Sequence, residues 1–168
     1  KKVNHDYKVF KIHRCSVRKM NLTVDIGNTF AKIGVFEDGV LIHKGVIPEW
    51  TENQILEYLT NQNGENVILS NVTGFSIDKL IAALRNRYNF WLLDERAQLP
   101  INNLYQTPET LGKDRIAAVV GGQHFFPNQN VLIIDAGTCI TYDWLRFNRD
   151  YLGGNISPGL KMRLQAMA

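Results

Sequence analysis

Two segments of this chain repeat one pattern, and this repeat constrains the fold more than any other feature. LTVDIGNTFAKIGVF occupies residues 22–36, and LIIDAGTCITYDWL occupies residues 132–145. In both, an apolar strand pattern ends in Asp-x-Gly, small hydroxyl or amide residues follow, and a second strand pattern returns. Most of the chain separates Asp25 from Asp135, a spacing far longer than the roughly 20 to 50 residues of a solenoid repeat. The repeat therefore predicts two related halves that face a shared cleft.

Strand patterns alternate with helical patterns along the rest of the chain. Asp38-Gly39 between two apolar runs predicts a hairpin turn, and Thr51 followed by Gln54 predicts a capping box that opens a helix. Phe75 before Ser76, with Leu80 further on, predicts a hydrophobic staple, with Ser76 as the N-cap of a second helix. The expected strands lie at 21–26, 30–36, 40–46, 66–71 and 90–93, and the expected helices start at Thr51 and cover 76–88 and 114–126. Such alternation predicts an α/β sheet layered by helices.

The composition is that of an ordinary globular protein. The chain is 45% hydrophobic and 21% charged, with 13 glycines and 5 prolines, which argues against collagen, coiled coils and wholesale disorder. No run approaches the roughly 18 consecutive apolar residues of a membrane span, so we expect no membrane partner. Cys15 and Cys139 lie far apart without a secretory leader before them. This favours a reducing, cytoplasmic location without disulfides.

The net charge of +3 is unevenly distributed along the chain. Residues 1–19 hold seven Lys or Arg against a single Asp, so the remainder is mildly acidic. A duplex-binding domain normally carries its positive charge on a folded face, so we expect no nucleic-acid partner. We interpret residues 1–19 as a basic, poorly ordered extension outside the fold. An arm that binds nucleic acid or anionic membranes is the alternative.

The two Asp-x-Gly turns carry the residue types of a phosphate site. Each follows an apolar strand, so its aspartate would stand at the carboxyl edge of a sheet, where open α/β sheets bind ligands. A carboxylate there can hold a cation, a glycine lets phosphate approach the backbone N–H groups, and Lys32 can reach a terminal phosphate. Turns that only reverse the chain are the alternative. The glycines and neutral donors of the two turns are Gly27, Asn28, Thr29, Gly137, Thr138 and Thr141.

Two further segments are candidates for the site. GKDR, residues 112–115, stands at the start of a helical pattern, where Asp114 can accept the proton of an attacking hydroxyl and Arg115 can hold an anion. A helix-dipole carboxylate beside a solvated arginine is the alternative. The glycines of YLGGNISPGL predict a loop that enters a helix at Leu160. We interpret the three tryptophans as packing residues: Trp50, Trp91 and Trp144.

DIGNT, GKDR, DAGTCIT and GGNISPG, in this order, resemble the motifs of type III pantothenate kinases. That family belongs to the superfamily of acetate and sugar kinases, heat-shock 70 proteins and actin. The resemblance runs from residue 20 to the end of the chain. It implies an actin-like ATPase (ribonuclease H-like) fold, with a mixed sheet, flanking helices and an incomplete second subdomain.

The resemblance also implies roles for individual residues. Asp114 would be the catalytic base, Asp135 would bind a monovalent cation, K⁺ or NH₄⁺, and Thr138 would bind ATP. The residues implied to bind the ATP phosphates are Asp25, Ile26, Gly27, Asn28, Thr29, Phe30, Ala31 and Lys32. Those implied to bind pantothenate are Tyr105, Gly112, Lys113, Asp114 and Arg115.

The activity implied by the resemblance is phosphoryl transfer from ATP, with Mg²⁺, to the alcohol group of pantothenate. The product is 4′-phosphopantothenate, in the first step of coenzyme A biosynthesis, and relatives are homodimers. Because relatives continue past GGNISPG, we expect a first subdomain at 20–130 and the truncated start of a second at 131–168. The alternatives are a kinase-like regulatory or accessory protein, an inactive fragment of this family, or a sugar or acetate kinase of the same superfamily.

Overall fold

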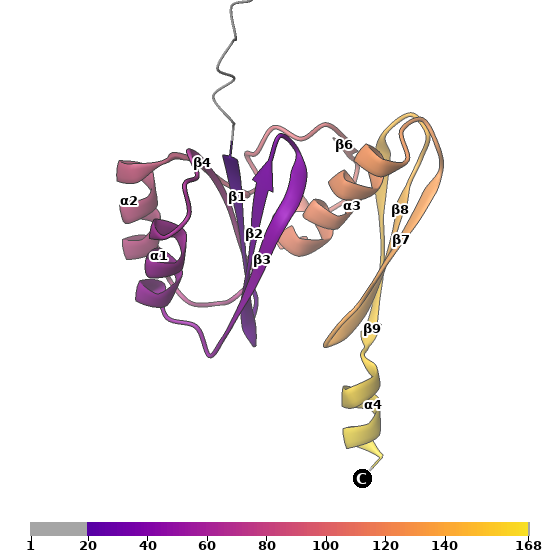
Figure 1. Cartoon of the computed structure of the whole chain (residues 1–168). Coiled ribbons are helices and arrows are strands. Elements are labelled where there is room, and N and C mark those ends of the chain that lie inside the picture. Colours follow the sequence, from indigo (N-terminus) through magenta and orange to yellow (C-terminus); the bar gives the residue numbers. More distant parts are fainter. Residues whose placement is uncertain (1–19, 168) are drawn as a thin grey trace, which may run out of the picture.

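The computed structural model describes residues 20–167, so the predicted basic extension at 1–19 lies outside the described residues. Two β-sheets lie side by side, with one helix between them and two helices on the far side of the first sheet (Figure 1). A short C-terminal helix extends away from both sheets (Figure 1). The α/β class predicted from the alternation of strands and helices is confirmed.

The first sheet consists of β1 (Met20–Ile26), β2 (Phe30–Glu37), β3 (Val40–Pro48), β4 (Asn66–Asn71) and β5 (Asn89–Leu92). Their order is β3-β2-β1-β4-β5. The hairpin pairs β1–β2 and β2–β3 are antiparallel, whereas β4 joins β1, and β5 joins β4, in parallel. The helices α1 (Glu52–Thr60) and α2 (Asp78–Arg87) connect the parallel strands and cover one face of the sheet (Figure 1). This mixed sheet agrees with the actin-like fold that the resemblance implies.

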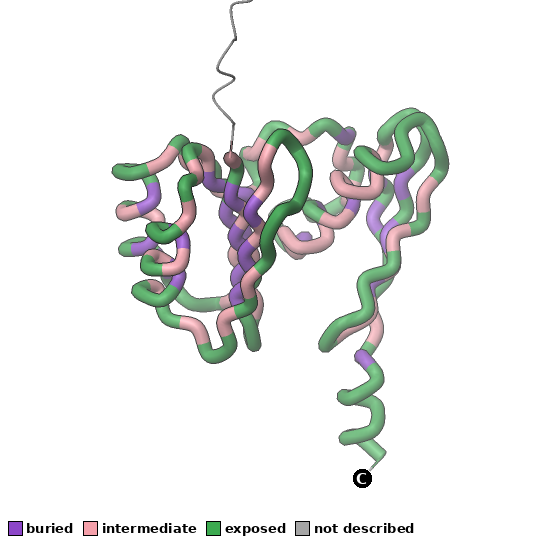
Figure 2. The backbone as a smooth tube through the Cα atoms, in the orientation of Figure 1, coloured by how far each residue is buried: buried purple, intermediate pink, exposed green. Residues whose placement is uncertain are grey.

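Alternation along β1 gives the first sheet a core face and a cleft face. Leu22, Val24 and Ile26 are buried in the core with α1 and α2. The central strands of the first sheet form the purple centre of Figure 2. Burial of one such aliphatic side chain stabilises the fold by roughly 1.5–3 kcal/mol. Thr23 and Asp25 lie on the opposite, cleft face, because successive side chains of a strand point to opposite sides.

The second sheet consists of β6 (Asn102–Asn103), β7 (Val131–Ala136), β8 (Cys139–Leu145) and β9 (Asp150–Pro158), in the order β6-β9-β8-β7. A 3-10 helix, Pro108–Thr110, precedes α3 (Lys113–Phe125). α3 packs against β7 and β8 and also contacts β4 of the first sheet. α3 therefore lies between the two sheets and contacts both.

The second core begins before the second Asp-x-Gly segment. It contains Leu93 and Ile116 together with Tyr151 of β9. The segment from Leu93 onward, which precedes residue 131, thus packs with the second sheet. The division into subdomains at 20–130 and 131–168 stays a prediction.

Two local predictions from turn and cap chemistry are confirmed. Asp38 and Gly39 both have positive φ angles, 49° and 84°, in the turn between β2 and β3. Thr51 caps α1 with a complete capping box: Gln54 N donates to Thr51 Oγ1 over 3.3 Å, and Thr51 N donates to Gln54 Oε1 over 2.8 Å. Both features are local, so short sequence patterns were sufficient to find them.

The predicted cap and staple at Ser76 are wrong. α2 begins at Asp78, and its N-cap is Ile77, without a side-chain hydrogen bond. Ser76 Oγ instead donates to the Asp78 carboxylate over 2.7 Å. Phe75 is 73% exposed, so it cannot form a staple with buried Leu80.

The predicted loop at YLGGNISPGL is also wrong, because most of this segment is strand β9, paired with β8, whereas the predicted helix start at Leu160 is confirmed by α4 (Leu160–Ala166). Its glycines permit close backbone contact. A Cβ on Gly154 would lie 1.7 Å from the Tyr142 carbonyl oxygen, and Gly153 has a φ of 92° that side chains rarely adopt. The glycines thus allow strand pairing with an irregular register.

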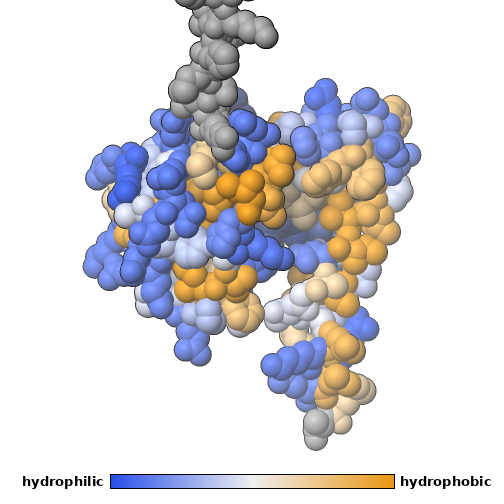
Figure 3. Space-filling model, in the orientation of Figure 1, coloured by the Kyte–Doolittle hydropathy of each residue, from blue (hydrophilic) through white to orange (hydrophobic). Residues whose placement is uncertain are grey.

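The outer surface carries many apolar side chains. In Figure 3 these residues gather over parts of both sheets, and the surface is hollowed between the sheets. Trp91 and Trp144 are 56% and 42% exposed, so their interpretation as packing residues is wrong, whereas Trp50 packs against the first core. α4 (Leu160–Ala166) is exposed along its length (Figure 2). No helix within residues 20–167 is long and apolar enough to cross a membrane.

Candidate active site

The two Asp-x-Gly segments form similar strand–turn–strand units. In the first turn, Gly27 N donates to Phe30 O over 3.0 Å, and in the second, Gly137 N donates to Cys139 O over 2.9 Å. Each aspartate lies two residues before its glycine, on the strand that enters the turn. The sequence repeat is therefore also a structural repeat.

A cavity of about 310 Å³ lies where β1, β4, α3 and β7 meet. It brings together one carboxylate from each of three sequence motifs: Asp25 from DIGNT, Asp114 from GKDR and Asp135 from DAGTCIT. The residues that line this cavity are Thr23, Val24, Asp25, Ile68, Ser70, Leu93, Asp114, Ala117 and Asp135. These three predicted residues are thus neighbours in space.

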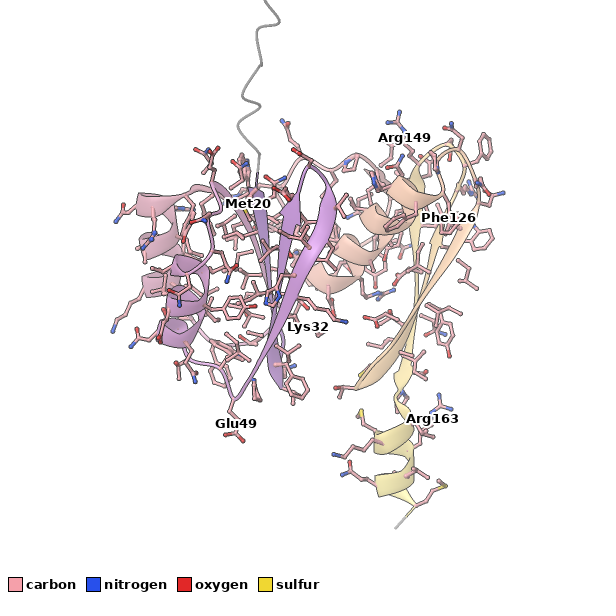
Figure 4. All side chains as sticks on the ribbon, in the orientation of Figure 1. Met20, Lys32, Glu49, Phe126, Arg149 and Arg163 are labelled. Atoms are coloured by element: carbon pink, nitrogen blue, oxygen red, sulfur yellow. The ribbon has the colours of Figure 1, made fainter. Side chains whose placement is uncertain are left out.

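Asp25 is partly buried in this cavity. Lys32 Nζ lies 3.6 Å from Asp25 Oδ2, on the neighbouring position of β2. Burial raises the pKa of Asp25 above its ordinary value; Lys32 opposes this rise, and the charge of Asp114 adds to it. Figure 4 shows Lys32 on the part of the first sheet that faces the second sheet.

Two buried oxygen atoms lie beside each other in the strand register, and apart from a weak contact between their two side chains, which lowers the pKa of Asp25, they have no hydrogen-bond partner among the described residues. They are Asp25 Oδ1 on β1 and Ser70 Oγ on β4. A buried polar atom without a partner costs roughly 1–3 kcal/mol, so such atoms are rare in packed regions and common where a ligand binds. Sequence reasoning missed Ser70, because its strand pattern resembled that of a core strand.

Asp114 stands in the first turn of α3, and its carboxylate folds back over the start of the helix. Asp114 Oδ1 accepts a hydrogen bond from Arg115 N over 2.9 Å. A Cβ on Gly112 would lie 2.5 Å from this same oxygen, so glycine leaves the room that the carboxylate occupies. Beside them, Lys113 Nζ is buried and has no hydrogen-bond partner among residues 20–167.

Arg115 is held by a residue that sequence reasoning missed. Its Nε donates to both Asp143 carboxylate oxygens over 3.1 and 3.2 Å, and its Nη2 donates to Oδ1 over 2.6 Å. Tyr151 OH donates to the same oxygen over 2.7 Å, and burial raises the pKa of this hydroxyl, which stays a donor. Asp143 is fully buried, and removal of one partner from such a pair typically costs roughly 3–5 kcal/mol.

Tyr105 reaches the same region from the segment before α3. A Cβ on Gly153 would lie 2.4 Å from the Tyr105 ring, so the GGNISPG strand makes room for this tyrosine. Tyr105 lies close to both Arg115 and Tyr151. The predicted pantothenate residues Tyr105, Lys113 and Arg115 therefore lie near each other around the start of α3.

The second turn is braced by the end of β9. Gly159 N donates to Thr138 O over 2.9 Å, and a Cβ on Gly159 would lie 2.3 Å from that oxygen. Asp135 is exposed and pairs across the hairpin with Thr141. The GGNISPG motif thus supports the DAGTCIT turn with its backbone.

The remaining predicted phosphate residues occupy different environments. Asn28, Thr29 and Phe30 are exposed at the first turn, whereas Ile26 and Ala31 are fully buried in the first core. Only the backbone of Ile26 and Ala31 is therefore placed to contact a ligand at this turn.

The donor set fits Mg²⁺ bound together with a phosphate. Mg²⁺ usually keeps several waters and takes one or two carboxylates plus phosphate oxygens. Asp25, with one buried and unpaired carboxylate oxygen, matches this need. Within the described residues no group of three or more His, Cys, Asp or Glu is arranged to hold a metal ion by itself.

The fold and the cavity define a mixed α/β protein with two Asp-x-Gly hairpins that face one cleft. The model of one protein family, type III pantothenate kinase, matches residues 21–168. The chain belongs to this family.

Curated relatives agree with the family match. The type III pantothenate kinase of Christiangramia forsetii is 45% identical over 153 residues, and that of Bacteroides fragilis is 42% identical over 153 residues. Each comparison covers 88% of this chain and 61% of the relative, so the chain spans less than two thirds of their length. Among solved structures, a polyphosphate/ATP-glucomannokinase from Arthrobacter has a TM-score of 0.45 at 13% identity, over 82% of this chain and 62% of that one. At this score the likeness says nothing further about the chain.

Proposed function

We propose that this chain carries the site for ATP-dependent phosphorylation of pantothenate to 4′-phosphopantothenate, the first step of coenzyme A biosynthesis. The observation that carries this proposal is the meeting of Asp25, Asp114 and Asp135 at one cavity. Three motifs that are far apart in sequence supply these carboxylates. Unpaired buried polar atoms at and beside the cavity support the binding of a polar ligand.

The first hairpin would bind the triphosphate. The backbone N–H groups of Asn28 and Thr29 and the Lys32 ammonium would face its oxygens, whereas the Gly27 N–H is already bonded to Phe30 O. Lys32 can turn to the phosphate, because its side chain is mostly exposed and its ion pair with Asp25 spans 3.6 Å, a length at which such pairs are weak. Asp25 would hold Mg²⁺, which neutralises charge on the phosphate oxygens. Thr138 of the second turn would add a neutral donor.

Asp114 would act as the general base. Its carboxylate accepts the proton of the pantothenate hydroxyl while that oxygen forms a bond to the γ-phosphorus. The bond from this phosphorus to the bridging oxygen of ADP breaks, and ADP leaves with the electron pair. Since phosphoryl transfer needs little covalent help, positioning of the two substrates supplies most of the rate.

Pantothenate would bind around the start of α3. The buried Lys113 ammonium lacks an acceptor within the described part of the chain and can pair with the anionic end of the substrate. Arg115 has Nε and one N–H of Nη2 committed to Asp143, so the two N–H groups of Nη1 and the second N–H of Nη2 are left for substrate. Tyr105 and Gly112 would complete this pocket.

The second hairpin would hold the monovalent cation, K⁺ or NH₄⁺, at Asp135. This carboxylate faces the neutral Thr141 across the hairpin, whereas Asp25 faces Lys32. Asp135 therefore keeps its negative charge available for a cation. We further infer a homodimer, as the resemblance to the family implies, and a cytoplasmic location, as the cysteine usage favours.

The proposal is tested by ADP release from the chain with ATP, Mg²⁺, K⁺ and pantothenate, followed by identification of the product. We expect ADP release that depends on pantothenate and yields 4′-phosphopantothenate. Asp114→Asn serves as the matched variant, since it keeps the shape of the site. Pantothenate-independent ADP release, or equal rates with a sugar in place of pantothenate, would contradict the proposal.

A further inference from the structure

The indole of Trp50 is bonded to the first Asp-x-Gly turn from a distant part of the chain. Trp50 stands between β3 and α1, directly after Glu49, which Figure 4 labels at the end of β3. Its Nε1 donates a hydrogen bond of 3.1 Å to the Gly27 carbonyl oxygen. Gly27 N donates to Phe30 O, so both polar groups of this glycine are engaged.

This bond fixes the orientation of one peptide group. The Gly27 carbonyl and the Asn28 N–H belong to the same planar trans peptide unit, so they point in opposite directions. Because the carbonyl points toward Trp50, the Asn28 N–H points away from it. No acceptor among residues 20–167 takes that N–H.

The direction of this N–H follows from where Trp50 packs. The indole lies against the first core, which is formed by the core face of the first sheet with α1 and α2. The Asn28 N–H therefore points away from the first core, although Asn28 itself lines a separate pocket with Trp50 and does not line the cavity at Asp25. Without the indole bond, the peptide could rotate and present its carbonyl oxygen to the same side, where an anion would be repelled.

We propose that Trp50 is a positioning residue for anion binding: it holds the Gly27–Asn28 peptide so that its N–H faces the polyphosphate of a nucleoside triphosphate. This inference rests on the proposed function, because it assumes that the first turn binds that polyphosphate. The ring also contributes packing, but packing alone does not require a hydrogen-bond donor at the indole edge.

Trp50→Phe separates the two contributions, since it keeps an aromatic ring and removes the N–H. We expect the dissociation constant for ATP, measured by calorimetry, to rise about five- to tenfold, the scale of one lost hydrogen bond that orients a charged ligand. Pantothenate affinity should stay within twofold. Trp144→Phe is the matched control, because Trp144 is exposed on the second sheet, and it should leave both affinities unchanged.

A second measurement keeps the native Trp50 and does not depend on how well Trp50→Phe folds. In the double variant Trp91→Phe and Trp144→Phe, Trp50 is the sole tryptophan, and saturating ATP should change its emission. Equal ATP affinity of the wild type and Trp50→Phe, or unchanged Trp50 emission at saturating ATP, would overturn the role of Trp50. Absence of ATP binding to the wild type would instead overturn the proposed function.

Discussion

The two Asp-x-Gly hairpins share a sequence pattern but differ in what faces the aspartate. Asp25 pairs with Lys32 across its hairpin, whereas Asp135 pairs with Thr141. In our proposal the first hairpin binds the triphosphate and Mg²⁺ through Lys32, its backbone donors and Asp25, and the second holds a monovalent cation at Asp135, which has no cationic residue opposite it in the hairpin. The residue opposite the aspartate, Lys32 or Thr141, can therefore give two copies of the same motif different ligands.

The supports of the two turns also differ. A side chain from before α1, Trp50, holds the first turn through Gly27 O. The backbone of Gly159 holds the second turn through Thr138 O. A substitution of Trp50 can thus remove the hydrogen bond to the first turn without a steric clash. Any side chain at Gly159 would instead clash with the carbonyl oxygens of Gly137 and Thr138 in the second turn.

The largest expected effect is at Asp114, the proposed base, which lines the same cavity as the aspartates of both hairpins. Asp114→Asn should lower turnover by roughly 10² or more, the usual scale for a general base. ATP and pantothenate affinities should stay within a few-fold, because the amide keeps the shape of the carboxylate. Steady-state kinetics and calorimetry measure both. Wild-type turnover would remove Asp114 from its assigned role.

The support of the second turn is tested by Gly159→Ala. A Cβ here would lie 2.3 and 2.4 Å from the carbonyl oxygens of Thr138 and Gly137, so we expect a loss of roughly 1–3 kcal/mol in the free energy of unfolding. Gly74→Ala is the matched control, since its Cβ would meet nothing within 4 Å. Denaturant titration measures both; equal stability of the two variants would contradict the close contact.

The charge of the first hairpin is tested by Lys32→Met. Loss of one charge-assisted contact should weaken ATP binding about tenfold, or roughly 1.4 kcal/mol. Lys79→Met removes the same charge from α2, on the opposite face of the sheet, and should leave ATP affinity unchanged. Equal weakening of ATP binding by both variants would show that Lys32 acts only through the net charge. Wild-type affinity of Lys32→Met would remove Lys32 from the proposed site.

The smallest expected effect concerns the stability of the chain with Asp25→Asn. Because burial raises the folded-state pKa of Asp25, the folded chain holds this proton more tightly than the unfolded chain. Stability from this group is therefore lost as pH rises through the folded pKa. At pH 7 we expect the Tm of Asp25→Asn to be no lower than that of the wild type and at most about 2 °C higher. The difference should vanish in acid; a lower Tm at pH 7 would contradict the desolvation of Asp25.

Local chemistry made much of the fold predictable from sequence. The capping box at Thr51 and the Asp38-Gly39 turn depend on neighbouring residues alone, and both are confirmed. The glycines of GGNISPG looked like a loop because clustered glycines are typical of turns, whereas here they permit the close pairing of β9 with β8, the strand directly before it.

The candidate site was predictable where a motif named its residues, and not where the contacts are long-range. Asp25, Asp114 and Asp135 come from motifs, and the structure brings them to one cavity. Asp143 and Trp50 act through partners 28 and 23 positions away. A single sequence carries no signal for such pairs, because neither residue stands in an unusual local pattern.

The most direct test of the divided roles is the ATP dissociation constant in K⁺ and in Na⁺ at equal ionic strength, for the wild type, Asp25→Asn and Asp135→Asn. We expect tighter binding in K⁺ for the wild type, and the same ratio, at weaker overall affinity, for Asp25→Asn. Asp135→Asn should bind ATP equally in both salts. A K⁺ preference that survives in Asp135→Asn, or that is absent from the wild type, would contradict the account.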